Sequence, residues 1–100
     1  MMQPSRSVIS AATKLVMAPK VSAKSLGENE GGVLLKLDSG EMFTVNDTTM
    51  TVLGALEDGI DFGELVSRLS DVFDVDREVL ESDLVEIAQD LLEQQLIRKA

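Results

Sequence analysis

The sequence predicts an α+β domain in which a three-stranded antiparallel sheet comes first and three helices follow. Between residues 20 and 46, apolar and polar residues alternate, with turn residues between the runs. From residue 47 to 97, apolar residues instead recur every three or four positions, which is the period of an amphipathic helix. Because the chain has only 100 residues, both halves belong to one modest core. Strands followed by three helices, the last of them long, predict a winged helix-turn-helix-like shape.

Three short segments carry the strand pattern. The first is KVSAKS, in which Val21 and Ala23 alternate with polar neighbours, and the loop GENEGG follows it. The second is VLLKLD, which begins at Val33. The turn signal DSG, at residues 38–40, joins it to the third segment, EMFTVN, as is typical of antiparallel neighbours.

Capping residues and a glycine divide the second half of the chain into three helices. Asn46 or Asp47 is suited to cap the first helix, and Gly59 lies where a glycine commonly ends one. Asp61 is expected to cap the second helix and Asp76 the third. Acidic residues crowd the first turns of the third helix and basic residues come only after its end, which suits the helix dipole.

The third helix has a broad apolar surface made of two adjacent stripes. One stripe contains Leu80, Leu84, Ile87 and Leu91, and the other contains Val85, Ala88, Leu92 and Leu96. At about 100° per residue, the two stripes together cover about half of the helix circumference. Either the domain packs around this helix on two sides, or one flank of the helix lines a groove for a partner.

Charge is distributed unevenly along the chain, whose net charge is −9. All 18 Asp and Glu residues lie between residues 26 and 97, where only Lys36, Arg68 and Arg77 oppose them. A folded part this acidic repels phosphate backbones, so nucleic acid is disfavoured as a partner. The same charge favours a basic or neutral peptide as the partner.

The first 18 residues are basic and contain no acid. We expect a flexible N-terminal tail over residues 1–18, ahead of a single domain over residues 19–100. Lys14 interrupts the apolar region that a secretory signal would need. No run of 18 apolar residues occurs, so no membrane span is expected. The default expectation is a cytoplasmic location.

Catalytic and metal-binding chemistry finds little support in the sequence. The chain has no His and no Cys, so it lacks the commonest general base, a thiolate nucleophile and the Cys/His type of zinc site. The segment DVFDVD lacks the loop glycine and the final glutamate of an EF-hand, and its acids are better explained as helix caps. GENEGG lacks the Lys and Ser/Thr of a phosphate-binding loop. We therefore expect no enzymatic activity, no metal and no cofactor.

A binding role remains, and the third strand is the best candidate for it. An open sheet edge accepts an extended peptide as a further strand, through backbone hydrogen bonds and side-chain pockets. The strand EMFTVN contains neither Pro nor Lys, which commonly protect edges, and a helix rather than another strand follows it. If the long helix runs beside this edge, the strand and the helix form the two walls of a groove.

The order of these segments resembles the PqqD-like family. The resemblance rests on VLLKLDSGEMFTVNDTTMTVLGALEDG, a helix followed by LSDVFDVD, and a last helix ending LLEQQLI, and it extends from about Pro19 to Ile97. Members of this family are small domains that recognise the leaders of ribosomally synthesised and post-translationally modified peptides. The resemblance implies a non-catalytic protein that captures the leader of a precursor peptide. It would present that peptide to a modifying enzyme, such as a leader peptidase or a radical-SAM maturase.

The resemblance also implies a binding site, because in the family the leader adds to the third strand and packs against the third helix. Carried over by position, the strand wall consists of Glu41, Met42, Phe43, Thr44, Val45 and Asn46. The helix wall is drawn from Asp83, Leu84, Ile87, Ala88, Leu91 and Gln95. Which of these helix residues face the peptide, and which face the core, stays open at this point.

Two features depart from the family pattern. Many relatives have an aromatic pair where this chain has Met42 and Phe43, and the basic segment before Pro19 is longer than the family needs. The segment VLL with its Ser-Gly turn favours the discrete lasso-peptide type over a radical-SAM or quinone-cofactor pathway. Two alternative functions stay open: an acidic adaptor that dimerises through the same edge, and, against its charge, a DNA-binding winged-helix regulator.

Overall fold

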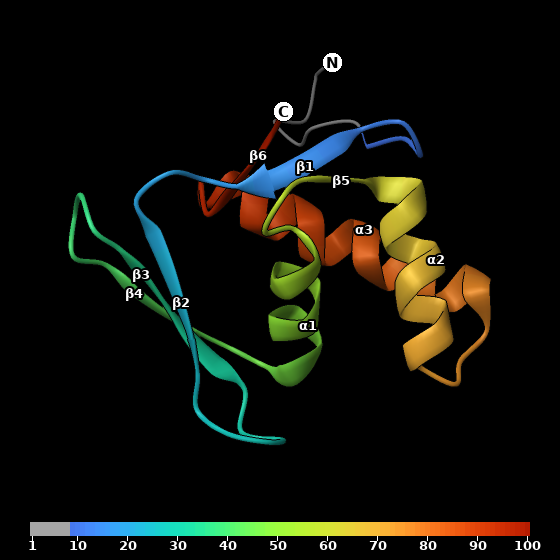
Figure 1. Ribbon diagram of the computed structural model, residues 1–100, viewed down its shortest axis with the longest axis horizontal. Helices are drawn as coiled ribbons and strands as arrows, with labels where there is room; N and C mark the ends of the chain where they lie inside the picture. Colours follow the sequence, from blue (N-terminus) through green and yellow to red (C-terminus); the bar gives the residue numbers. More distant parts are fainter. Residues whose placement is uncertain (1–8) are drawn as a thin grey trace, which may run out of the picture.

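The computed structural model describes residues 9–100, which form two small sheets and three helices (Figure 1). The strands are β1 (Lys14–Met17), β2 (Val21–Ser25), β3 (Gly32–Lys36), β4 (Met42–Val45), β5 (Ile60–Asp61) and β6 (Ile97–Lys99). The helices are α1 (Asp47–Ala55), α2 (Phe62–Val72) and α3 (Arg77–Glu93). One antiparallel sheet has the order β2–β3–β4 and the other has the order β5–β1–β6. The predicted α+β class is therefore confirmed, whereas the single predicted sheet is replaced by two.

The β2–β3–β4 sheet is the one that the sequence predicts. Its register pairs Leu34 of β3 with Phe43 of β4, and Leu34 is fully buried. Phe43 and Val45 pack against the core on the same face of the sheet. Met42 and Thr44 alternate to the opposite face, where both are exposed. β4 therefore has one apolar face toward the protein and one face toward solvent.

The β5–β1–β6 sheet corrects the prediction. The sequence predicts a flexible tail over residues 1–18, but residues 14–17 form β1, the central strand of this sheet. Leu15 is 0% exposed and pairs with Ile60 of β5 and Lys99 of β6. The tail prediction is wrong for this stretch, and residues 1–8 lie outside the described part of the chain. A four-residue strand shows little alternation, and its two partners are distant in the sequence, so no local pattern reveals it.

The predicted caps mark the helix boundaries. Asn46 and Asp76 each accept a hydrogen bond from a backbone N–H in the first turn of α1 and α3, respectively. Asp61 occupies the predicted N-cap position of α2, but its side chain makes no capping hydrogen bond. The N–H of Gly63, in the first turn of α2, donates instead to the Ala11 carbonyl at 2.9 Å. The segment before β1 thus satisfies an amide that the predicted cap leaves free.

The core lies between the β5–β1–β6 sheet and the three helices, with α3 running below β1 in the view of Figure 1. The largest fully buried side chains come from both sheets, from the helices and from the segments at helix ends: Leu15, Leu34, Leu56, Phe62, Leu65, Leu84, Leu96 and Ile97. The β2–β3–β4 sheet extends to one side of this core (Figure 1). Within residues 9–100, no helix has the length and apolar character that a bilayer crossing requires.

Candidate functional site

β4 is an edge strand, and half of its backbone groups point away from the sheet. The Lys36 N–H donates to the Glu41 carbonyl at 2.9 Å, and in an antiparallel ladder every second pair bonds in this way. Phe43 therefore bonds to β3, whereas the N–H and C=O groups of Met42 and Thr44 point toward the open edge. Two residues of β4 thus offer four backbone groups to a further strand.

A hollow of about 510 Å³ lies between this edge and α3. Its lining residues come mainly from β4 and α3, which form opposite walls: Met42, Phe43, Thr44, Val45, Asn46, Thr49, Ile87, Asp90, Leu91, Gln94 and Leu96. We refer to this hollow as the β4–α3 groove. Its apolar lining is contributed by the core-facing side chains of β4 and by one flank of α3. A strand added to β4 would place every second side chain inside it.

The broad apolar surface of α3 faces the core and the groove at the same time. Leu84 and Ala88 are each 1% exposed and belong to the core. Ile87 is half-buried and lines the groove together with Leu91. One part of the apolar surface is therefore packed inside the domain, and a neighbouring part lines the groove.

The structure brings together most, though not all, of the residues expected at a peptide site. Those that line the β4–α3 groove are Met42, Phe43, Thr44, Val45, Asn46, Ile87 and Leu91. Leu84 and Ala88 lie in the core instead, and Gln95 lines a separate depression. Asp83 is exposed one turn before Ile87 and is not among the lining residues. Glu41 comes just before β4, and its carboxylate takes part in a polar network at the end of the groove.

Four lining residues escape the prediction from sequence: Thr49, Asp90, Gln94 and Leu96. Asp90 and Gln94 follow Ile87 at helical spacings of three and seven, so the position of Ile87 on α3 is the signal that identifies them. Thr49 comes from α1 and is 9% exposed, with its N–H bonded to the Asn46 side chain. No sequence pattern reveals Thr49, because only the packing of α1 beside β4 places it there.

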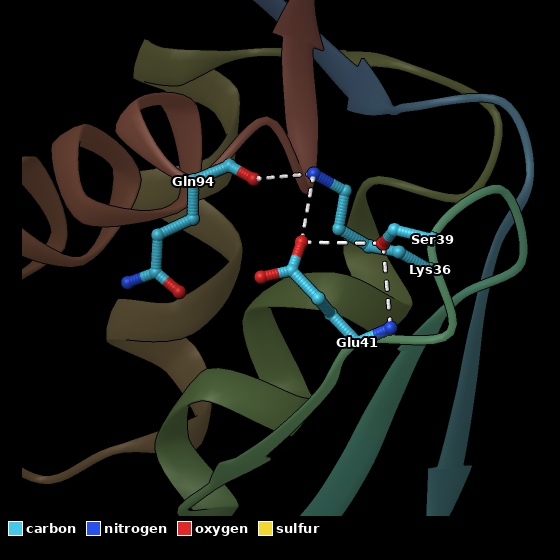
Figure 2. A network of polar contacts seen from close by, with 4 residues as sticks. All are labelled: Lys36, Ser39, Glu41 and Gln94. Atoms are coloured by element: carbon cyan, nitrogen blue, oxygen red, sulfur yellow. Dashed lines mark hydrogen bonds and ion pairs between the residues drawn. The ribbon is translucent and has the colours of Figure 1, made fainter.

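A polar network ties the start of β4 to the end of α3 (Figure 2). Lys36 Nζ donates to the main-chain carbonyl of Gln94 at 3.3 Å and lies 3.9 Å from Glu41 Oε1. Ser39 Oγ donates to the same Glu41 oxygen at 3.2 Å and accepts from the Glu41 N–H at 3.3 Å. Gln94 is the C-cap of α3, whose last turn contains no basic residue. Lys36 therefore supplies, from the sheet, the positive charge that a helix C-terminus favours.

The helix wall of the groove is acidic on its solvent side. Exposed carboxylates follow one another along α3, at Asp83, Glu86, Asp90 and Glu93, and Asp90 also lines the groove. In residues 9–100, no three His, Cys, Asp or Glu side chains are grouped so that they could hold a metal ion. The groove thus combines an open strand edge, a partly apolar lining and a negatively charged rim.

The chain belongs to the PqqD family, described as coenzyme PQQ synthesis protein D, whose sequence pattern matches residues 31–97. This confirms the resemblance found in the sequence. The matched span includes β3, β4 and all three helices, and therefore both walls of the β4–α3 groove. No curated protein matches the sequence significantly.

Three solved structures share the fold. "TbiB1 in Complex with the TbiA(beta) Leader Peptide" is 24% identical, with a TM-score of 0.72, and the match covers 83% of this chain and 94% of that one. "Lasso peptide synthetase B1 complexed with the leader peptide" is 26% identical, with a TM-score of 0.70 and coverages of 84% and 96%. The PqqD part of Methylobacterium extorquens PqqCD, a stand-alone recognition element for ribosomally synthesised and modified peptides, is 16% identical, with a TM-score of 0.75 and coverages of 91% and 95%.

Proposed function

We propose that this chain is a non-catalytic binding protein that captures the leader segment of a ribosomally synthesised precursor peptide by β-strand addition. The observation that carries the proposal is the free edge of β4, which faces α3 across the β4–α3 groove. Strand addition uses outward backbone groups for affinity and pockets beside the strand for specificity, and this site has both. Two structures of the same fold hold leader peptides, which supports the same type of ligand here.

The proposed contacts divide between backbone and side chains. The leader would pair with the N–H and C=O groups of Met42 and Thr44. Alternate leader side chains would enter the groove and contact Phe43, Ile87 and Leu91, while the others would lie on the exposed face of the sheet. Leu84 and Ala88, expected from the sequence at the site, would support α3 from the core instead of touching the peptide.

We further propose that the bound leader delivers the rest of the precursor to a modifying enzyme. A leader peptidase of the lasso-peptide type is the partner that we favour, because one of the similar structures is a lasso peptide synthetase component of about the same length. A radical-SAM maturase is the alternative partner. The exposed acidic face of α3 lies beside the groove and remains accessible for such a partner when a peptide is bound.

Amide hydrogen exchange, followed by NMR, tests strand addition residue by residue. The probe is the leader of a precursor encoded beside the gene for this chain, and a scrambled peptide of the same composition is the control. In the free protein, the Met42 and Thr44 amides should exchange quickly, while those of Phe43 and Val45 are protected by β3. Leader binding should slow exchange at Met42 and Thr44, and should shift the amide signals of Ile87 and Gln94.

New protection at every second amide of β4 is specific to strand addition. Equal protection of all four β4 amides on binding would indicate a general rigidification and would contradict the proposal. Absence of any change with the leader, together with concentration-dependent broadening at β4, would instead support the dimerising adaptor. Chemical-shift changes produced equally by the scrambled peptide would show that charge alone causes the binding.

A further inference from the structure

A second hollow, of about 650 Å³, lies on the other side of the network that joins Lys36 to Gln94. Three parts of the chain line it: the connection from β1 to β2, the turn from β3 to β4, and the end of α3 with β6. Its polar and charged lining residues are Lys20, Lys36, Asp38, Ser39, Gln95, Arg98 and Lys99. We refer to this hollow as the basic depression.

The charge of the basic depression is opposite to that of the rest of the molecule. It gathers four of the nine Lys and Arg residues of the chain and only one of its 18 acidic residues, Asp38. In the rest of residues 9–100, only Lys14, Lys24, Arg68 and Arg77 oppose the acidic residues, and a surface with such an excess of carboxylates repels a negatively charged ligand. A carboxylate that approaches this protein would therefore be attracted mainly to this hollow, where a concave wall keeps several cations close together.

Lys20 has an unusual backbone conformation for its residue type. Its φ is 62°, in the left-handed region that Gly and Asn tolerate much better than Lys. The Lys20 carbonyl accepts a hydrogen bond from the Leu37 N–H at 2.8 Å, and its Nζ lies 3.5 Å from Asp38 Oδ1. Both side chains of that pair are largely exposed, so the pair is weak and leaves Lys20 accessible to a second carboxylate. This conformation costs a lysine free energy, which favours a functional role for the residue at this position.

The basic depression lies next to the β4–α3 groove, beyond the start of β4. Gln94 lines the groove and the next residue, Gln95, lines the depression. The network in Figure 2 joins the two hollows, because Lys36 and Ser39 line the depression and Lys36 donates to the carbonyl of Gln94, which lines the groove. A peptide that lies along β4 and extends past Met42 would pass this boundary first, and then reach the turn at Ser39 that borders the depression.

We propose that the basic depression binds acidic side chains of the same peptide, on the stretch that continues past Met42. This inference rests on the proposed function, because it takes the peptide to lie along β4. Acidic side chains of this peptide are the ligands that fit, because the depression is positively charged and lies next to the groove. Side chains in the groove would determine where the peptide sits, and carboxylates in the depression would fix how far it extends past the start of β4.

Peptides with appended tails test the inference. The probe is the leader of a precursor encoded beside this gene, carrying three glutamates or three glutamines through a short Gly-Ser spacer, at either its N- or its C-terminus. At about 50 mM salt, the peptide with a glutamate tail at one terminus should bind about 3- to 10-fold more tightly than the peptide with a glutamine tail at the same terminus. This factor is the combined effect expected of two or three exposed ion pairs. The advantage should disappear at about 500 mM salt, and should be absent at the other terminus.

Variants of the full chain test whether the basic depression causes the tighter binding of the glutamate-tailed peptide. Lys20→Asn and Arg98→Gln should each reduce the advantage of the glutamate tail, while affinity for the glutamine-tailed peptide is unchanged. Lys24→Gln, which removes a charge from the exposed face of β2, is the matched control and should change neither value. Asn suits the left-handed conformation at position 20, so unfolding cannot explain the loss in that variant. A thermal melt of each variant verifies this.

The outcomes separate the two proposals. If the glutamine-tailed peptides bind but glutamate adds nothing at either terminus, the inference about the depression is overturned and the leader-binding function stands. The inference is also overturned if Lys24→Gln reduces the advantage as much as Arg98→Gln, since the effect would then come from net charge. If none of the four peptides binds, both proposals fail.

Discussion

The two sheets of this protein have three strands each but occupy different places in the molecule. The β2–β3–β4 sheet is built from neighbouring segments of the chain and ends in an open edge beside a groove. The β5–β1–β6 sheet joins the beginning, the middle and the end of the described chain, and its central residue Leu15 is completely buried. Long-range closure of the fold and the open edge beside the groove therefore lie in different sheets: one sheet holds distant segments together, and the other presents free backbone groups.

The first way to test this separation is to weaken the closing sheet. Leu15→Ala should lower the free energy of unfolding by about 3 kcal/mol, because the change leaves a cavity at a fully buried site between two sheet partners. Urea denaturation measures the loss. The leader should bind the folded variant with unchanged affinity, and a large loss of affinity at temperatures where the variant is folded would show that the two sheets are coupled.

The second test removes a donor from the open edge. Thr44→Pro should weaken leader binding about 30-fold, about 2 kcal/mol, since the outward N–H is lost and its partner carbonyl is left without a hydrogen bond. Stability should change little, because proline is tolerated on edge strands where the N–H faces away from the sheet. Thr44→Ala keeps the N–H and serves as the control, with expected affinity near that of the natural protein. Calorimetric titration gives both values; equal losses in the two variants would refute backbone pairing at this residue.

A third test contrasts two flanks of α3. Ile87→Ala should weaken leader binding by about 1 kcal/mol, roughly fivefold, because Ile87 lines the groove and loses apolar contact area. Val85→Ala is the matched control, since Val85 is also half-buried but lies about 200° around the helix and is not part of the groove lining. Both variants should lose similar amounts of stability. If the two variants bind the leader with equal affinity in a titration, the Ile87 flank of α3 does not contact the leader.

The smallest expected effect concerns the network between the sheet and α3. Lys36→Met keeps most of the buried stem but removes the charge near the Gln94 carbonyl, and should weaken leader binding by about 0.5 kcal/mol. The loss should shrink in high salt. Lys24→Met on exposed β2 controls for net charge. An unchanged affinity in Lys36→Met would show that the groove keeps its width without this contact.

The β2–β3–β4 sheet and the helix starts could be predicted because their signals are local. Alternation defines the strands, the turn residues between β3 and β4 join them, and Asn46 and Asp76 cap the helices that follow. β1, β5 and β6 could not be predicted, since strands of two to four residues carry little periodicity and pair only across long sequence separations. The buried Leu15 looks, in the sequence, like one apolar residue in a basic segment.

The strand wall of the candidate site was easier to predict than the helix wall. Alternation along β4 places its residues on defined faces, and all five residues from Met42 to Asn46 line the groove. On α3, apolar side chains occur around half of the circumference, so the period alone cannot tell core from groove. Only the tertiary packing shows that Ala88 is covered while Ile87, its neighbour, lines the groove.

The outward orientation of the Met42 and Thr44 backbone has a consequence for evolution. Every amino acid except proline carries the same N–H and C=O groups, so most mutations at these two codons leave the edge of β4 chemically unchanged. Sequences can then drift while the architecture persists, and the similar structures retain this fold at 16 to 26% identity. A gene of this kind can diverge along with its peptide through changes on one helix face, without rebuilding the strand beside it.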